Sequence, residues 1–217
     1  MRLVFLGPPG IGKGTQAALL ARRRGLTHTS TGVIIRATIK AETEIGLEAE
    51  KYVREGRLVP DRLVREMAES AIAEHNYDKF VLDGYPRTIV QAEWLTEFLS
   101  NHNAPLDAVI NLDVPTDVIV DRLSKRRVHK LTGENFHLDY NPPPRDVDQK
   151  LIIQRKDDHP EYIRKRLEVY RQETKPVEEY YRERGTFIEI DGVGEIEEVY
   201  SRIEDSLAAS LLEKKPS

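Results

Sequence analysis

A glycine-rich segment near the N-terminus combines the residue types that bind phosphate groups. It runs from Gly7 to Thr15 with the sequence GPPGIGKGT, after an apolar run at Leu3–Leu6 and before a helical pattern. Glycines let backbone N–H groups converge on an anion, and the helix that follows adds its positive N-terminal end. A simple strand-to-helix turn needs only glycines, whereas Lys13 and Thr15 add an ammonium group and a hydroxyl. The segment predicts a site for nucleotide phosphates. It differs from the general phosphate-loop pattern in that Gly14 follows the lysine and the hydroxyl comes one residue later, at Thr15.

A second polar segment, Asp83 to Thr88, follows another apolar run at Phe80–Leu82. In a parallel sheet it lies at the same edge as the phosphate loop. A lone aspartate at a strand end is most often a turn former or a helix N-cap. Beside a phosphate loop, however, a carboxylate can help to hold a hydrated magnesium ion. We predict Mg²⁺ near Thr15 and Asp83, bound largely through water.

Several arginines are spaced so that they could surround a highly anionic substrate. Arg122 and Arg126 are four residues apart on a predicted helix and share a face, while Arg155 and Arg166 flank the end of a predicted insert. A single helical arginine is most often solvated, so a functional role rests on their joint position beside the phosphate loop. Phosphoryl transfer needs fixed positive charge around the transferring group more than it needs covalent chemistry. The predicted set is Arg36, Arg87, Arg122, Arg126, Arg155 and Arg166.

Short apolar runs alternate with helical patterns along the chain. The runs cover residues 3–6, 80–82, 108–112 and 187–190, and each ends at glycine or aspartate. Continuous apolar runs are typical of strands buried on both faces, and strands separated by helices imply right-handed crossovers. We therefore expect a parallel sheet covered by helices on both faces, with ligands at the carboxyl ends of its strands.

Two segments interrupt this alternation. Residues 30–59 have a helical pattern with breaks at Gly46 and Gly56, and no strand is predicted there. Residues 127–157 contain turn-forming and short aromatic runs, which predict a small β-rich insert able to act as a mobile cover. Beyond the insert we predict a helix over residues 161–172 that Pro176 interrupts or restarts, and a frayed tail at residues 214–217.

The composition argues against several classes of function. The chain has 217 residues, with 33 Lys and Arg against 37 Asp and Glu and a net charge of −4. Because there is no net positive charge, binding along a nucleic-acid backbone is disfavoured as the main role. The absence of cysteine excludes disulfides, thiolate zinc sites and a catalytic thiol. No segment approaches the roughly 20 apolar residues that span a bilayer, so we expect no membrane association and a cytoplasmic location.

Taken together, the motifs resemble those of the adenylate kinase family in its long-lid form, and the resemblance covers nearly the whole chain. The motifs that carry the resemblance occur in the same order and with the same spacing as in that family. They lie at residues 7–15, 30–32, 83–88, 121–122, 126–129, 141–143 and 155–158.

This resemblance implies an α/β fold: a P-loop kinase core with a parallel sheet flanked by helices, a helical AMP-binding subdomain and a small β-rich lid. The implied boundaries are residues 1–29, 60–125 and 158–217 for the core, 30–59 for the AMP-binding subdomain and 126–157 for the lid. The implied reaction is reversible phosphoryl transfer from MgATP to AMP, giving two ADP. The implied partners are ATP, AMP and ADP, and the implied assembly state is a monomer.

The resemblance also implies roles for individual residues. The implied catalytic residues are Lys13, Arg87, Arg122, Arg155 and Arg166. The implied ATP-binding residues are Gly10, Ile11, Gly12, Lys13, Gly14, Thr15, Arg122, Arg126, Asn135, Phe136 and Gly194. The implied AMP-binding residues are Thr31, Arg36, Arg57, Leu58, Val59, Gly84, Tyr85, Pro86, Arg87, Gln91, Arg155 and Arg166.

The chain departs from the family pattern at two places. Val33 follows Ser-Thr-Gly where the family usually has an acidic residue, so the AMP pocket lacks that hydrogen-bonding group. Some relatives hold the lid with four cysteines around zinc. Here His129 and Thr132 occupy the first two of these positions, which resembles zinc-free lids held by hydrogen bonds, and Asp146 and Asp148 are available for the other half. We predict no structural zinc.

Two alternatives remain open from the sequence. One is a long-lid relative that uses GTP as donor or another nucleoside monophosphate as acceptor. The other is a nucleotide-binding regulatory module without turnover, which the retention of Lys13 and the arginines disfavours. An assay of ADP formation across ATP, GTP, AMP, CMP and UMP separates these possibilities.

Overall fold

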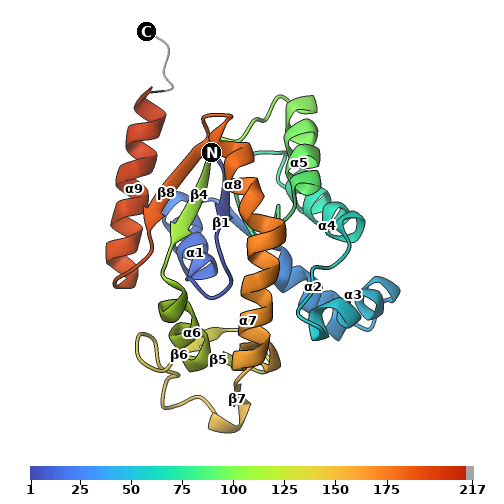
Figure 1. Ribbon diagram of the computed structural model, residues 1–217, viewed down its shortest axis with the longest axis vertical. Coiled ribbons are helices and arrows are strands. Elements are labelled where there is room, and N and C mark those ends of the chain that lie inside the picture. The colour runs from blue at the N-terminus through green and yellow to red at the C-terminus, as the bar shows by residue number, and fades with distance from the viewer. Residues whose placement is uncertain (214–217) are drawn as a thin grey trace.

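A parallel sheet of five strands forms the centre of the computed structural model, which describes residues 1–213 (Figure 1). The strands are β1 (Arg2–Leu6), β2 (Thr27–Ser30), β3 (Phe80–Asp83), β4 (Ala108–Asp113) and β8 (Phe187–Asp191), in the spatial order β2-β3-β1-β4-β8. The chain moves to one side of β1 for β2 and β3 and to the other side for β4 and β8. Such a reversal opens a crevice at the carboxyl end of the central strand, where the phosphate loop follows.

The strand β2 was not predicted from the sequence. Residues 27–30 are Thr-His-Thr-Ser, which contain no apolar run, and β2 lies at the edge of the sheet, where only β3 pairs with it. We expected no strand within residues 30–59. This is wrong at residue 30 alone, because β2 ends at Ser30. The other four strands agree with the predicted runs to within one residue at each end.

Helices cover both faces of the sheet, as predicted. Alternate residues of β1 face opposite layers: Leu3 and Phe5 pack with α1 (Lys13–Arg24) and α9 (Ile196–Glu213), whereas Val4 and Leu6 pack in the layer that holds α4, α5 and α8. The bounds of that second set of helices are Asp61–Ala73, Ile89–Asn101 and Lys175–Arg182. This period-two pattern explains why the buried strands consist of continuous apolar residues.

The segment after β2 forms two packed helices, α2 (Thr31–Lys40) and α3 (Glu44–Arg54). Gly56, at φ +69°, follows the end of α3 as predicted, but the break predicted at Gly46 is wrong. Gly46 lies in the first turn of α3, where a Cβ atom would be 2.2 Å from the Thr38 carbonyl oxygen of α2. The glycine therefore permits close helix packing, and the break lies at residues 41–43 instead.

A second, three-stranded antiparallel sheet forms the insert (Figure 1). Its strands are β5 (Arg126–His129), β6 (Asn135–His137) and β7 (Ile152–Ile153), and α6 (Thr116–Lys125) leads into it. Three of its large apolar side chains, Leu131, Leu138 and Ile153, are exposed, while Phe136 is buried. The predicted β-rich character is confirmed.

The chain returns from the insert through three consecutive helical segments. They are α7 (Pro160–Val169), a π-helical turn (Tyr170–Thr174) and α8. Pro176 occupies the first turn of α8, where its missing N–H group is tolerated, so the predicted restart is confirmed. Within residues 1–213, no helix has the length and apolar character needed to cross a membrane. The predicted frayed tail, residues 214–217, lies outside the described residues.

Candidate active site

A cleft of about 530 Å³ lies at the carboxyl edge of the main sheet and is lined also by α2, the α3–α4 connection and the β5–β7 insert. Its volume is within the usual range for small-molecule sites. With one exception, every predicted binding or catalytic residue lines it. The predicted phosphate-binding residues 10–15, the predicted metal residue Asp83 and the six arginines named above contribute to its walls. So do the predicted contacts Thr31, Arg57, Leu58, Val59, Gly84, Pro86, Gln91, Asn135, Phe136 and Gly194.

The exception is Tyr85, which was predicted in the AMP pocket. Its side chain is fully buried among the residues of the α4, α5 and α8 layer and does not line the cleft. Burial raises the pKa of the Tyr85 phenol, with the carboxylate of Glu69 adding to the effect. Its neighbours Gly84 and Pro86 do line the cleft, so the Tyr85 side chain anchors this loop to the core.

The phosphate loop has the backbone geometry that anion binding requires. Gly7, Gly10 and Gly12 all have φ between +87° and +122°, a region that residues with a Cβ atom rarely adopt. At Gly10 a Cβ atom would also be 2.3 Å from the Leu123 side chain. The helix α1 begins at Lys13, within the last three residues of this segment, and has neither an acidic residue in its first turn nor a side-chain cap. Its first N–H groups are therefore available to an anion.

Lys13 folds back over the loop that carries it. Its Nζ donates to the carbonyl oxygens of Gly7 at 2.7 Å and Pro8 at 2.6 Å. Burial lowers the pKa of Lys13 to about 7, and the neighbouring Asp83 opposes this shift only in part. The ammonium group is thus held in place by two neutral acceptors, and an incoming phosphate offers it a stronger, charged partner.

We expect this pKa to make nucleotide binding depend on pH. Phosphate oxygens bind the ammonium form of Lys13, so above pH 7 the free protein must take up a proton on binding. Affinity for ATP should therefore fall by up to about tenfold per pH unit from pH 7.5 to 9, where the nucleotide itself is already fully ionised. Calorimetric titration at several pH values measures this slope. The Lys13→Arg variant keeps its charge and should show a flat profile, and a flat profile in the native protein would contradict the assignment.

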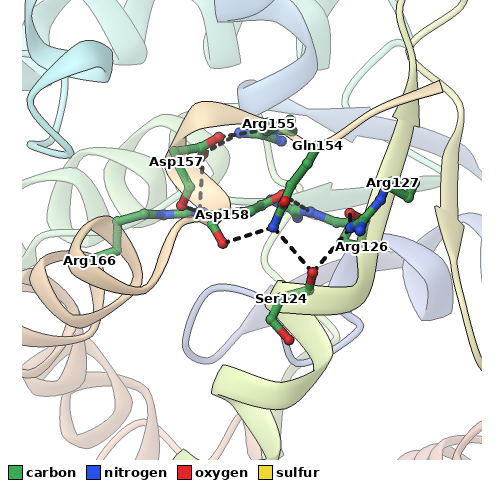
Figure 2. Close-up of polar contacts among 8 residues, drawn as sticks. All are labelled: Ser124, Arg126, Arg127, Gln154, Arg155, Asp157, Asp158 and Arg166. Atoms are coloured by element: carbon green, nitrogen blue, oxygen red, sulfur yellow. Dashed lines mark hydrogen bonds and ion pairs between the residues drawn. The ribbon is translucent and has the colours of Figure 1, made fainter. Parts of the chain in front are cut away.

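Arginines from three segments meet aspartates at the junction between the insert and the core (Figure 2). Arg126 binds both carboxylate oxygens of Asp158, with Nε at 2.8 Å from Oδ2. Arg155 binds both oxygens of Asp157, with Nε at 2.8 Å from Oδ1. Arg166 reaches both acids, at 3.0 Å from Asp157 Oδ2 and 3.5 Å from Asp158 Oδ1. The structure thus brings these three arginines together at one junction.

The two aspartates were not predicted as site residues, although Asp157 and Asp158 stand in the motif shared with the adenylate kinase family. Burial would raise the pKa of Asp157, but Arg155 and Arg166 outweigh it and hold the pKa at about 2. Burial lowers the pKa of Arg166 to about 10, against the attraction of Asp157. Asp157 and Arg166 are therefore both charged at neutral pH. The paired carboxylates compensate arginines that also line the cleft.

The remaining arginines line the cleft from other elements. Arg122 donates to the carbonyl oxygens of Ile11 at 3.3 Å and Gly192 at 3.1 Å, and so links the phosphate loop to the segment after β8. Arg87 donates through Nε to the Gly84 carbonyl at 2.8 Å. Burial lowers the pKa of Arg36 to about 10, and repulsion from Arg155 and Arg126 adds to this effect. Such mutual repulsion is relieved when an anion binds among them.

Polar residues near β3 form the wall opposite the insert. Thr31 donates its hydroxyl to the Gly84 carbonyl oxygen at 2.8 Å. Gln91 is almost fully buried; its Nε2 donates to Asp61 at 2.7 Å and its Oε1 accepts from the Arg87 N–H at 2.7 Å. Each amide atom of Gln91 keeps one further hydrogen-bonding capacity that a ligand could use. The role of Asp61 in orienting this amide was not predicted.

Oxygen ligands for a magnesium ion lie beside the phosphate loop. Thr15 is exposed to the cleft, and the carboxylate of Asp83 lies so close to the loop that a Cβ on Gly14 would be 3.2 Å from it. Ser30 also contacts Asp83, at 3.4 Å. A carboxylate and a hydroxyl fit Mg²⁺, which usually keeps several waters and binds substrate phosphates as well. Among residues 1–213, no group of three or more His, Asp or Glu side chains could hold a metal alone.

The sheet, the phosphate loop after its central strand and the surrounding arginines define a P-loop nucleotide-binding protein of the α/β class. A family model described as adenylate kinase matches residues 5–186 of the chain. The chain belongs to the adenylate kinase family.

Curated relatives match the chain along nearly its full length. It is 58% identical over 209 residues to a protein of Salinibacter ruber named adenylate kinase, covering 96% of this chain and 99% of that one. Proteins of the same name from Chloroherpeton thalassium and Streptomyces avermitilis are 42% and 44% identical, and the matches cover 97% and 95% of this chain. They cover 99% and 97% of those two relatives.

Proposed function

We propose that this adenylate kinase catalyses reversible transfer of the γ-phosphoryl group of MgATP to AMP, giving two ADP. The observation that carries the proposal is the convergence of Lys13 with seven arginines on one cleft that has a phosphate loop at its base. Two nucleotides that meet through their phosphates bring many negative charges together. Fixed cations compensate this charge, and they stabilise the charge that develops on the transferring group.

We assign the donor to the side of the cleft formed by the phosphate loop. Backbone N–H groups from Gly10 to Thr15 would hold the ATP phosphates, and Lys13 would move from its carbonyl partners to the transferring group. Arg122 and Arg126 would contact the same phosphates, while Asn135, Phe136 and Gly194 would contact the base or ribose. When bound with ATP, Mg²⁺ neutralises phosphate charge, and Thr15 and Asp83 would orient its water shell.

The acceptor is assigned to the opposite wall. Arg36 and Arg87 would bind the AMP phosphate, and Arg155 and Arg166 would bridge the two nucleotides. Thr31, Gln91 and the segment 57–59 would surround the nucleoside. We also propose that residues 30–59 and 126–157 are separate subdomains on a core formed by residues 1–29, 60–125 and 158–217, and that the enzyme is a cytoplasmic monomer.

The acceptor pocket should discriminate among nucleobases. A buried polar wall built around the Gln91 amide leaves groups unpaired when the wrong base binds, and unpaired buried groups are costly. We expect kcat/KM for AMP to exceed that for CMP and UMP by at least about a hundredfold. An assay of diphosphate formation with ATP or GTP as donor and AMP, CMP or UMP as acceptor measures this. Similar values for the three acceptors would contradict the AMP pocket, and a preference for GTP would reassign the donor.

The lid is proposed to hold together without zinc. His129 Nδ1 lies 2.9 Å from the Thr132 hydroxyl and accepts from its N–H at 3.1 Å, so these two residues hydrogen-bond to each other. In the other half, Asp148 caps the backbone at Lys150, and the N–H of Lys130 donates to the Leu151 carbonyl. We expect elemental analysis of the purified protein to find less than one tenth of an equivalent of zinc, about the level of trace contamination. A stoichiometric zinc content would contradict this assignment.

A further inference from the structure

The lid joins the core through two short chain segments, and the side chain of Gln154 is one of the groups that link them. Residues 124–127 lead from α6 into β5, and residues 154–158 lead from β7 to α7. Figure 2 shows the Gln154 side chain between the two. Its Nε2 donates to the Ser124 carbonyl oxygen at 3.1 Å and to the Asp158 carbonyl oxygen at 3.4 Å.

We propose that Gln154 is a positioning residue of the lid hinge, whose amide keeps the two connecting segments in fixed register. The inference rests on the proposed function, because it concerns how the arginines reach the phosphates. Arg126 lies on the first segment and Arg155 on the second, so any slip between the segments displaces one guanidinium relative to the other. A misplacement of about 1 Å among groups that contact the transferring phosphate can cost up to about a hundredfold in rate.

The chemistry of the amide fits this bridging position. Nε2 carries two hydrogens, and both of its partners are backbone carbonyls that only accept. Ser124 lies in the last turn of α6, where carbonyl groups lack partners within the helix. Gln154 is partly buried at the junction, so these bonds are shielded from water on one side.

A second contact also joins the segments, but bound nucleotide would compete for one of its two partners. The carboxylate of Asp158 on the second segment binds the Arg126 guanidinium on the first. Arg126 is proposed to bind ATP phosphate, which would share or displace this contact when nucleotide is present. The bonds of Gln154 use backbone carbonyls alone, so no substrate group competes for its partners. This contact between the segments can therefore persist through the whole cycle.

Arg127 provides a matched comparison, because it shares one partner with Gln154 without joining the segments. Its Nη1 donates to the Ser124 carbonyl at 3.1 Å and to the Arg126 carbonyl at 2.7 Å. Both acceptors belong to the first segment. Losing Arg127 therefore removes a bond to Ser124 but leaves the link between the segments intact.

The test replaces Gln154 with methionine, which keeps the length of the side chain and removes its donors. Arg127→Met is the control for a lost bond to Ser124, and Gln149→Met is the control for a lost lid amide, since Gln149 donates only locally to the Val147 carbonyl. The chain has no cysteine, so cysteines introduced at the exposed positions Lys130 in the lid and Asp205 in the core can carry dyes specifically. The readouts are the distribution of dye distances, kcat, KM for AMP and the unfolding temperature.

We expect Gln154→Met to broaden the distance distribution of the nucleotide-free protein and to lower kcat by about tenfold. KM for AMP should change by less than about twofold, because the acceptor wall lies on other elements. Both controls should retain native distributions and native kcat. If Gln154→Met fails to fold, Gln154→Asn keeps the amide one methylene short of its partners, and we then expect a loss of about threefold.

Native kcat and a native distance distribution in a folded Gln154 variant would overturn the inference, as would equal losses in the Arg127→Met control. Failure of the proposed function gives a different result, since the native protein itself would then form no ADP from ATP and AMP.

Discussion

Replacing Lys13 with methionine is expected to lower turnover by at least about a hundredfold while leaving the fold intact. The ammonium group donates to the carbonyls of Gly7 and Pro8 through the hydrogen bonds described above, and the aliphatic stem of methionine fills a similar space. What is lost is a positive charge at the transferring phosphate. Steady-state rates at saturating ATP and AMP measure the effect.

The matched control is Lys51→Met, which makes the same change at an exposed position on α3. It should leave turnover within about twofold of the native value. Circular dichroism and the unfolding temperature show whether Lys13→Met is folded. A folded Lys13→Met enzyme with near-native turnover would remove Lys13 from the mechanism.

The second large effect is expected at Asp158, the fully buried carboxylate between Arg126 and Arg166. Removing one partner of a buried ion pair leaves the other charge without compensation. We expect Asp158→Ala to lower the free energy of unfolding by about 3 kcal/mol, measured by urea denaturation. Activity should fall as well, because both arginines lose the group that orients them.

The control for Asp158 is an ion pair of the same chemistry on the surface. Glu50 binds Arg54 one turn away on α3, where Arg54 is largely exposed. The Glu50→Ala variant should lower the free energy of unfolding by less than about 0.5 kcal/mol. If Asp158→Ala were no more destabilising than Glu50→Ala, the buried cluster would not be a stabilising element of the junction.

The parts of the site that depend on neighbouring residues in the chain could be predicted from the sequence. The phosphate loop is one such part, because its glycines, Lys13 and Thr15 act within nine consecutive residues. Strands with continuous apolar runs were also recognisable. The edge strand β2 was not recognisable, because a strand at the edge of the sheet does not need a continuous apolar sequence, and Thr27–Ser30 has none.

Features set by distant partners were missed or misplaced. Arg126 meets Asp158 across 32 residues, and no local pattern predicts this pairing. Gly46 was interpreted as a break because glycine weakens isolated helices, whereas its role is set by the Thr38 backbone of a neighbouring helix. Tyr85 follows a cleft residue in sequence, but its ring faces the core. In each case the role of the residue is set by tertiary packing, which local sequence propensity does not predict.

The central claim is that this cleft transfers a phosphoryl group directly between two nucleotides. It is tested most directly by mixing the enzyme with MgATP labelled at the γ-phosphate and following the label, with and without AMP. With AMP, the label should appear in ADP, and two ADP should form for each ATP consumed. Without AMP, no phosphate should be released, because we expect the β5–β7 insert to cover the cleft and exclude water from the transferring group. Release of labelled inorganic phosphate at a rate independent of AMP, or label that remains in ATP when AMP is present, would contradict the account.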